Sequence, residues 1–210
     1  MSRAKTNPER HAATRAALLR QARRMFSEVG YAGAATEEIV RRAEVTRGAL
    51  YYHFRDKQAL FEAVFEDVAR EIAARTDAAA APARDALDGL LRGTKAFLDA
   101  CLEPAARRIY LIDAPSVLGW HRWREIDGRH GVRSLREGIE AVLTAHPDRA
   151  LSPEVLTYLL SGALNEAVLW LNEARDEKAA RREIDRTLPL LFERLFGVRR
   201  QSRQDGTAKR

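Results

Sequence analysis

One short stretch of the sequence combines small, aromatic and basic residues in a way that suits contact with double-stranded DNA. It consists of Arg47, Gly48, Ala49, Tyr51, Tyr52 and His53, followed by Lys57. An arginine can donate two hydrogen bonds to a guanine in the major groove, and residues without bulk let a helix backbone approach the base edges. Tyrosine, histidine and lysine side chains can donate to phosphates. The stretch therefore predicts base contacts at its start and phosphate contacts at its end.

The elements that must position this stretch are two short helices with a tight turn between them. Thr36 is predicted to cap the first helix, where Glu37 would be stabilised by the helix dipole. Thr46 follows a three-residue turn and is predicted to cap the second helix, which runs to Phe54. Leu50 and Phe54 lie four residues apart and would face inward. The pattern predicts a helix-turn-helix, with free N–H groups at Thr36 available to a phosphate.

The rest of the chain has helical periodicity and no strand-like alternation, so we predict an all-α fold. A helix before the helix-turn-helix would end at Gly30, and Asp56 would cap a long helix after it. Further helices are predicted from Pro82 and from Pro104. The pattern then gives a single long helix over about residues 120–145, and two more after Ser152.

The net charge of +6 is distributed unevenly along the chain. Residues 1–57 carry 12 Lys and Arg against 6 Asp and Glu, whereas residues 58–196 carry 19 against 23. A basic N-terminal part on a mildly acidic body favours a polyanion as partner. Charge by itself would equally fit a solvated arginine-rich surface.

Composition sets limits on what else the chain could be. Cys101 is the only cysteine, which excludes an internal disulfide and a multi-cysteine zinc site. No apolar run approaches the roughly 18 residues of a membrane span, and no secretory leader is evident, so a cytoplasmic protein without membrane contact is predicted. The acidic and histidine residues between 113 and 130 lack the spacing of zinc motifs. No phosphate loop or nucleophile elbow occurs, so we expect no catalysis, metal or cofactor.

The stretch from about Thr14 to Phe65 closely resembles the DNA-binding domain of the TetR family of bacterial transcriptional repressors. The resemblance depends on the hallmark Leu50, Tyr51, Tyr52, His53 and Phe54, followed by Lys57. It implies the same contacts that the residue types suggest. By this resemblance the DNA-binding residues are Thr36, Glu37, Thr46, Arg47, Gly48, Ala49, Tyr51, Tyr52, His53 and Lys57.

Two positions depart from the usual pattern of that family. Glu44 occupies the turn position at which a glycine is common in that family, so either a non-glycine residue adopts a strained φ here or the turn differs. Ala35 stands where a threonine is common, so the cap of the first short helix must come from Thr36 or be weaker. Both departures concern local geometry.

The remainder resembles the regulatory domain of the family more loosely. The resemblance implies a DNA-binding domain over residues 1–56 and a helical effector-binding and dimerisation domain over 57–197. Residues 198–210 are predicted to be a disordered basic tail. The last two helices would form a four-helix bundle with those of a second subunit in a homodimer. The apolar residues that suit this role are Leu156, Leu160, Ala163, Leu164, Leu188, Leu191 and Leu195, although these stripes could instead face the core of their own subunit.

Aromatic residues in the C-terminal part suggest a small hydrophobic or aromatic effector. The predicted ligand-binding residues are Phe97, Tyr110, Asp113, Trp120, Trp123, Asn165, Glu166 and Trp170. Large aromatics in helical proteins are often simply core, but buried polar groups beside them would need a partner. The sequence thus predicts a ligand-responsive repressor that binds a palindromic operator as a dimer. Two alternatives stay open: a constitutive DNA-binding regulator without effector, and an unrecognised helical enzyme.

Overall fold

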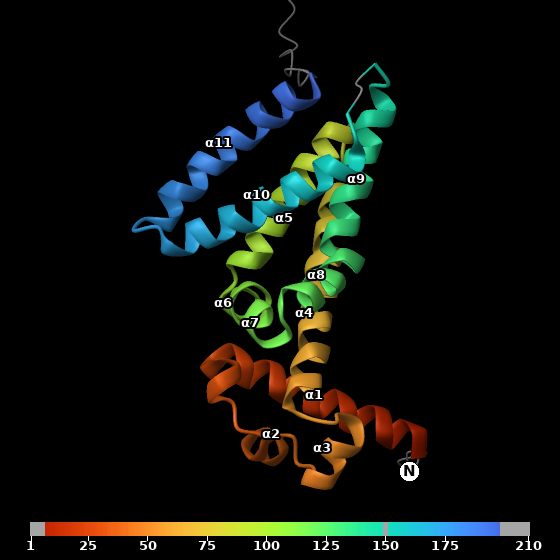
Figure 1. Cartoon of the computed structure of the whole chain (residues 1–210), viewed down its shortest axis with the longest axis vertical. Helices are drawn as coiled ribbons and strands as arrows, with labels where there is room; N and C mark the ends of the chain where they lie inside the picture. Colours follow the sequence, from red (N-terminus) through yellow and green to blue (C-terminus); the bar gives the residue numbers. More distant parts are fainter. Residues whose placement is uncertain (1–6, 149–150, 198–210) are drawn as a thin grey trace, which may run out of the picture. The chain divides into compact units, whose positions relative to one another are not determined.

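The computed structural model describes residues 7–148 and 151–197, and within these residues it contains helices and no strand (Figure 1). The predicted all-α fold is confirmed. The predicted disordered tail, 198–210, lies outside the described residues. The elements are α1 (Asn7–Gly33), α2 (Thr36–Arg42), α3 (Arg47–His53), α4 (Lys57–Ala80), α5 (Ala86–Leu102), α6 (Pro104–Arg107), the π-helical turn η1 (Arg108–Asp113), α7 (Ala114–Leu118), α8 (Trp120–Arg129), α9 (Gly131–Ala145), α10 (Pro153–Glu173) and α11 (Glu177–Phe196).

The chain groups into two compact units. Unit 1 is drawn from Met1–Arg75 and Phe97–Arg133, and unit 2 from Thr76–Ala96 and Ser134–Arg210. Three helices, α4, α5 and α9, have residues in both units, which sequence periodicity does not reveal. The functional division after residue 56 stays a prediction, because it concerns the role of each part and not its compactness. No helix in the described part of the chain is long and apolar enough to cross a membrane.

Unit 1 has an aromatic core that joins α1, α4 and η1. The rings of Phe26 and Phe61 meet edge to face with centroids 5.0 Å apart, and those of Phe65 and Tyr110 are 5.4 Å apart. All four side chains are buried. Such pairs add about 0.5–1.5 kcal/mol beyond the area they bury. The core fixes α1 on α4, and the two short helices α2 and α3 then pack beneath α1 (Figure 1).

The helical path of α1 breaks at Gly30, as its sequence predicts. Gly30 has φ 75° and ψ 173°, a conformation that residues with a side chain rarely adopt. A Cβ there would also lie 2.5 Å from Nη2 of Arg108. The Nη1 of the same arginine donates to the carbonyl oxygen of Glu28 over 3.4 Å. On the other side of the break, the N–H of Tyr31 donates to Oδ2 of Asp113 over 2.8 Å. Two side chains of η1 therefore hold the main chain of α1 on both sides of Gly30.

Replacement of Gly30 by alanine should destabilise the protein by about 1–3 kcal/mol, because the backbone strain falls on a residue with a Cβ and Arg108 must move away. Thermal or urea unfolding measures this change. Gly128 provides the matched control, since it lies within α8 and a Cβ there meets nothing within 4 Å. Gly128→Ala should leave stability unchanged or raise it by up to about 1 kcal/mol. Equal effects of the two substitutions would contradict the role assigned to Gly30.

Pro115 does not interrupt the helical path of unit 1. Pro115 lies in the first turn of α7, and the chain stays helical from Pro104 through η1 to Leu118. Proline is tolerated in a first turn, where its missing N–H has no intrahelical acceptor. The π-helical turn η1 ends directly before α7. The helical path ends at Gly119, where φ is 79°.

The predicted single helix over residues 120–145 is also wrong. It is interrupted at His130, which has φ −122° and ψ −89° and separates α8 from α9. Asp127 is buried just before this point, and its Oδ1 accepts a hydrogen bond from the Tyr110 hydroxyl. A Cβ on Gly131 would lie 3.0 Å from that same Oδ1. The chain thus bends around a buried polar pair whose existence depends on tertiary contacts.

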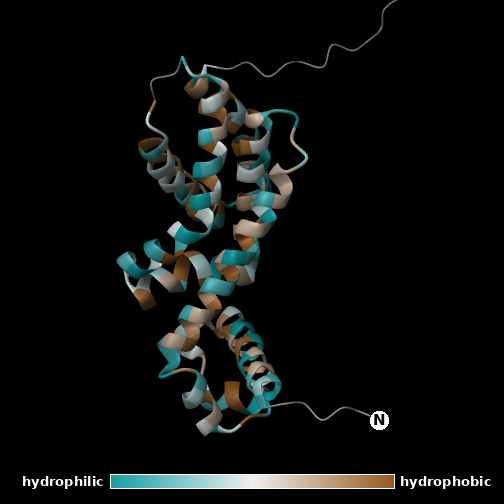
Figure 2. Cartoon of the chain, turned by 90° about the vertical axis from the view of Figure 1, so that its right-hand side faces the viewer, coloured by the Kyte–Doolittle hydropathy of each residue, from teal (hydrophilic) through white to brown (hydrophobic). Residues whose placement is uncertain are grey.

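Among the residues that the structure describes, α10 and α11 of unit 2 expose several large apolar side chains. Figure 2 shows hydrophobic and hydrophilic residues in alternating bands along the helices. Three of the residues assigned above to a subunit interface, Leu156, Leu160 and Leu164, are buried within their own chain, as is Leu188. The exposed apolar residues on these two helices are Val155, Tyr158, Leu159, Trp170, Leu190 and Leu191. We call this set the open face of unit 2. Of the predicted interface residues, it keeps Leu191.

Candidate DNA interface

The sequence of α3 divides its residues between the core of unit 1 and the surface. The hydroxyl of Thr46 accepts a hydrogen bond from the N–H of Ala49 over 3.1 Å, which confirms the predicted cap. Leu50 and Phe54 are buried, as predicted. Tyr52, by contrast, is 76% exposed. An aromatic side chain this exposed has room to contact a partner.

The start of α3 presents an exposed arginine beside a glycine. The Arg47 side chain is 71% exposed, with Nη1 3.7 Å from Oε1 of Glu37 and the guanidinium 5.5 Å from the centroid of the Tyr51 ring. An exposed ion pair of this length contributes little to stability, so Arg47 can leave it for another acceptor at little cost. At Gly48 a Cβ would meet only the Thr46 hydroxyl, at 3.8 Å. Packing within the protein thus does not require a glycine at position 48, and the space around its Cα is open.

The turn before α3 contains the strain that its sequence suggests. Glu44 has φ 54°, and it is the only residue other than glycine with positive φ in the described part of the chain. A left-handed conformation costs a residue with a Cβ roughly 1–2 kcal/mol. The turn is held by the N–H of Val45, which donates to the carbonyl oxygen of Val40 over 3.2 Å. The two helices therefore keep the helix-turn-helix arrangement despite the missing glycine.

Thr36 does not cap α2. Ala35 occupies the cap position, no side chain makes a cap hydrogen bond there, and Thr36 is the first residue of the helix. The hydroxyl of Thr36 instead donates to Oε2 of Glu37 over 3.1 Å. Hydrogen bonds from the Glu37 backbone and from Thr36 lower the pKa of the Glu37 carboxyl. The first turn of α2 thus has main-chain N–H groups that donate to no N-cap side chain and are available to a phosphate. The Glu37 carboxylate would have to move away from a phosphate bound there.

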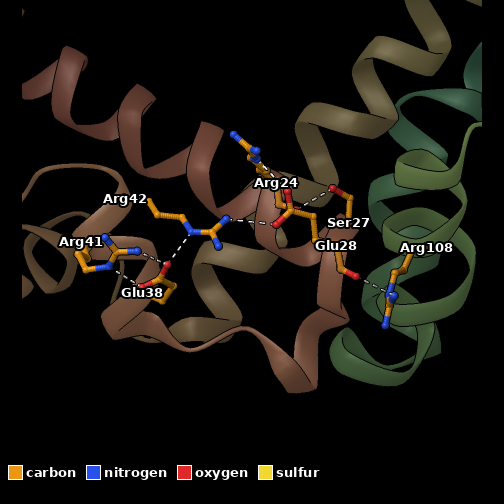
Figure 3. Close-up of polar contacts among 7 residues, drawn as sticks. All are labelled: Arg24, Ser27, Glu28, Glu38, Arg41, Arg42 and Arg108. Atoms are coloured by element: carbon orange, nitrogen blue, oxygen red, sulfur yellow. Dashed lines mark hydrogen bonds and ion pairs between the residues drawn. The ribbon is translucent and has the colours of Figure 1, made fainter.

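Ion pairs hold α2 on α1. The guanidinium of Arg42 reaches Oε1 of Glu38 at 2.7 Å and Oε2 of Glu28 at 3.2 Å, so one side chain joins two helices (Figure 3). Arg41 reaches the same Oε1 of Glu38 at 2.6 Å and its Oε2 at 2.7 Å, and hydrogen bonds from both arginines lower the pKa of the Glu38 carboxyl to about 2. The sequence analysis missed this bridge. The spacing of Glu38 and Arg42, four residues apart on a helix, was the available signal.

The end of the helix-turn-helix passes into α4 as predicted. Oδ1 of Asp56 accepts a hydrogen bond from the N–H of Ala59 over 2.7 Å, which caps α4. The Nζ of Lys57 lies 4.5 Å from the centroid of the Tyr31 ring, and burial lowers the pKa of this ammonium. Lys57 therefore has a protein partner in addition to the phosphate contact predicted for it.

The residues predicted to bind an effector are distributed over both units. Phe97, Tyr110, Asp113, Trp120 and Trp123 belong to unit 1. Tyr110 and Trp123 are buried, and Nε1 of Trp123 donates to the Tyr110 carbonyl oxygen over 2.9 Å. The Tyr110 hydroxyl binds Asp127, and Asp113 accepts from Tyr31. These two polar groups are thus satisfied within the protein, and the argument that each needs a ligand as partner does not apply to them.

The other three predicted ligand residues lie on α10 in unit 2. Trp170 is exposed and belongs to the open face, Glu166 is exposed, and Asn165 is half-buried. Of the residues described, no group of three or more His, Cys, Asp and Glu is arranged to hold a metal ion.

Comparisons with known proteins agree with the geometry of the helix-turn-helix. Residues 18–64 match the family of bacterial regulatory proteins of the tetR type, and residues 87–195 match the tetracyclin repressor-like C-terminal domain. A curated relative, the HTH-type transcriptional repressor Rv1474c of Mycobacterium tuberculosis, is 39% identical over 95 residues, which are 45% of this chain and 48% of that protein. The A-factor receptor protein of Streptomyces griseus is 49% identical over 43 residues, 20% of this chain and 16% of that protein. The chain thus spans half or less of the length of these two relatives.

Solved structures extend the likeness to the whole chain. The crystal structure of a TetR-family transcriptional regulator from Pectobacterium atrosepticum is 35% identical in sequence, with a TM-score of 0.74 over 95% of this chain and 100% of that one. The structure of RolR in complex with resorcinol is 19% identical, with a TM-score of 0.69 over 92% of each chain, and shows the shared fold. The protein is therefore a DNA-binding transcriptional regulator that belongs to the TetR family.

Proposed function

We propose that the protein is a repressor that binds a two-fold symmetric operator as a homodimer, with the α3 helix of each subunit in a major groove. The observation that carries this proposal is the start of α3, where the exposed Arg47 and the open space at Gly48 lie side by side. The exposed Tyr51 and Tyr52 extend the same surface. Together these residues offer the donors and the close backbone approach that reading of bases requires.

The open face of unit 2 supports the proposed dimer. It presents six large apolar or aromatic side chains to solvent, and Leu159 is 65% exposed. Burying one such side chain contributes about 1.5–3 kcal/mol, so the face has enough apolar surface to stabilise an association. A two-fold operator needs a two-fold protein, and a two-fold interface buries the same face on both subunits.

Selection of DNA by the full chain from a pool of random duplexes tests the proposal. We expect enrichment of one sequence with two inverted half-sites, their centres about one helical turn or a multiple of it apart. This enriched sequence is called the selected duplex below. A pool that stays random after repeated rounds, although the protein binds DNA, would indicate attachment to phosphates without reading of bases.

A small aromatic effector is a further part of the proposal. One support is a pair of stacked tryptophan rings: the exposed Trp120 and the buried Trp123 have centroids 4.8 Å apart. The other support is the resorcinol bound in RolR. Titration with resorcinol and other simple phenols should quench or shift tryptophan emission and weaken binding to the selected duplex over the same concentration range. Full DNA affinity in the presence of every phenol tested would favour the alternative of a constitutive regulator. The predicted cytoplasmic location also remains a proposal.

A further inference from the structure

Two histidines from different helices meet at the C-terminal end of α3. The ring of His11, from α1, lies 4.2 Å from that of His53, centroid to centroid. Tyr52 completes the group, with its ring 5.4 Å from His11 and 5.5 Å from His53. His11 and Tyr52 are exposed and His53 is half-buried. Four residues after His11 on α1, the exposed Arg15 lies with its guanidinium 5.5 Å from the centroid of the Phe54 ring. We call His11, Arg15, Tyr52 and His53 the α1–α3 cluster.

The α1–α3 cluster has positive charge that no carboxylate of the described residues neutralises. Neither imidazole nor the Arg15 guanidinium forms an ion pair there, although arginines elsewhere on α1 and α2 do so. Burial, and then the charges of His11 and Arg15, lower the pKa of His53. These are the charged groups that face His53, and Tyr52 is its titratable neighbour on α3. Protonation of His53 is therefore disfavoured in the free protein, first by burial and then by these neighbouring positive charges.

A DNA phosphate would supply that anion. The cluster offers two imidazoles, one guanidinium and one phenol hydroxyl as donors, and it directly follows the residues of α3 to which base contacts are assigned. We propose that His11 and Arg15 extend the phosphate-binding surface of α3 onto α1, and that the imidazoles of His11 and His53 take up a proton when DNA binds. This inference rests on the proposed function, since it needs α3 to lie against DNA.

The direction of the pH effect follows from the proton balance. Well above the pKa of the bound imidazoles both rings are neutral in the free and bound protein, so the affinity for DNA does not change with pH. A phosphate beside the rings raises their pKa in the complex. As the pH falls through this raised value, the complex binds protons that the free protein does not, and the affinity increases. For each imidazole, a pKa that rises by one unit on binding gives at most about a tenfold increase in affinity.

The test compares the affinity for the selected duplex at about pH 8 and about pH 6, the range in which unperturbed histidines titrate. The wild type should bind about tenfold more tightly at the lower pH. His11→Gln and His53→Gln keep a hydrogen-bonding side chain but cannot titrate, and each should remove much of this increase. Arg15→Gln should weaken binding at both pH values and leave the ratio largely intact. His121→Gln, a substitution of an exposed histidine on α8, should behave like the wild type.

Two further measurements make the outcome decisive. Calorimetric titration in two buffers of different ionisation enthalpy counts the protons taken up, and His11→Gln should reduce that count. NMR titration of the imidazoles should show a higher pKa with the duplex than without it. The same titration with inorganic phosphate in place of the duplex distinguishes an effect of DNA from the effect of any free anion. The inference would be overturned if His11→Gln left the ratio of the affinities at pH 6 and pH 8 unchanged. It would also be overturned if the pKa rose with inorganic phosphate but not with the duplex. Failure to bind any duplex at either pH would instead contradict the proposed function.

Discussion

Leu159→Arg is expected to convert the protein to a monomer and to reduce its affinity for the selected duplex by about 10²–10⁴-fold. Leu159 belongs to the open face and is 65% exposed, so its replacement should leave the core of unit 2 intact. In the proposed dimer the arginine would be buried against the same face of a second subunit, with its charge unpaired. The loss of affinity is large because the second half-site contact would no longer be intramolecular.

Sedimentation and binding to the selected duplex, measured on the same preparation, check this expectation. Ile112→Arg is the matched control, because Ile112 is also an exposed aliphatic residue but lies on η1 in unit 1. It should remain a dimer with normal affinity. Circular dichroism should show that both variants keep their helices. A folded Leu159→Arg variant that still sediments as a dimer would place the subunit interface elsewhere.

The helix-turn-helix could be predicted from the sequence because its signals are local. Thr46 and Asp56 cap the helices that follow them, and the inward residues Leu50 and Phe54 lie one helical turn apart. Spacing along the chain was sufficient in each case. The positive φ of Glu44 was indicated only by the resemblance to the TetR family, in which a glycine is common at this position, and the sequence left a different turn open.

The elements that were predicted wrongly depend on contacts between distant residues. The break at His130 follows from the bond between Tyr110 and Asp127, which are 17 positions apart. Periodicity describes the faces of a helix but contains no information about a partner in another segment.

The interface residues on α10 illustrate the same limit in another form. The helix has apolar residues on two sides, one with Leu156, Leu160 and Leu164, and one with Val155 and Leu159. Both sides show helical spacing, so the sequence could not decide which of them packs inside the subunit. The structure buries the first side. An arginine at Leu160 would consequently disturb the core of unit 2, and it would not test dimerisation.

Arg47→Ala should weaken binding to the selected duplex by about 1–3 kcal/mol and relax the preference for one base pair in each half-site. The guanidinium is 71% exposed and has only a long ion pair to Glu37 and a ring contact with Tyr51, so its loss should leave the stability of unit 1 almost unchanged. The binding free energy that Arg47→Ala removes is then the contribution of the contacts between Arg47 and DNA. Lys57→Ala is the comparison, because a contact to phosphate contributes equally for every sequence and its removal flattens the dependence of affinity on salt.

The most direct test of base reading by α3 is the ratio of affinities for the selected duplex and for a duplex of scrambled sequence, at one fixed salt concentration. This ratio should be high for the wild type, remain nearly as high for Lys57→Ala, and fall by about 5-fold to 150-fold for Arg47→Ala, the equivalent of about 1–3 kcal/mol. If Arg47→Ala lowers both affinities by the same factor, so that the ratio equals that of the wild type, Arg47 does not read bases and the account of the interface is wrong.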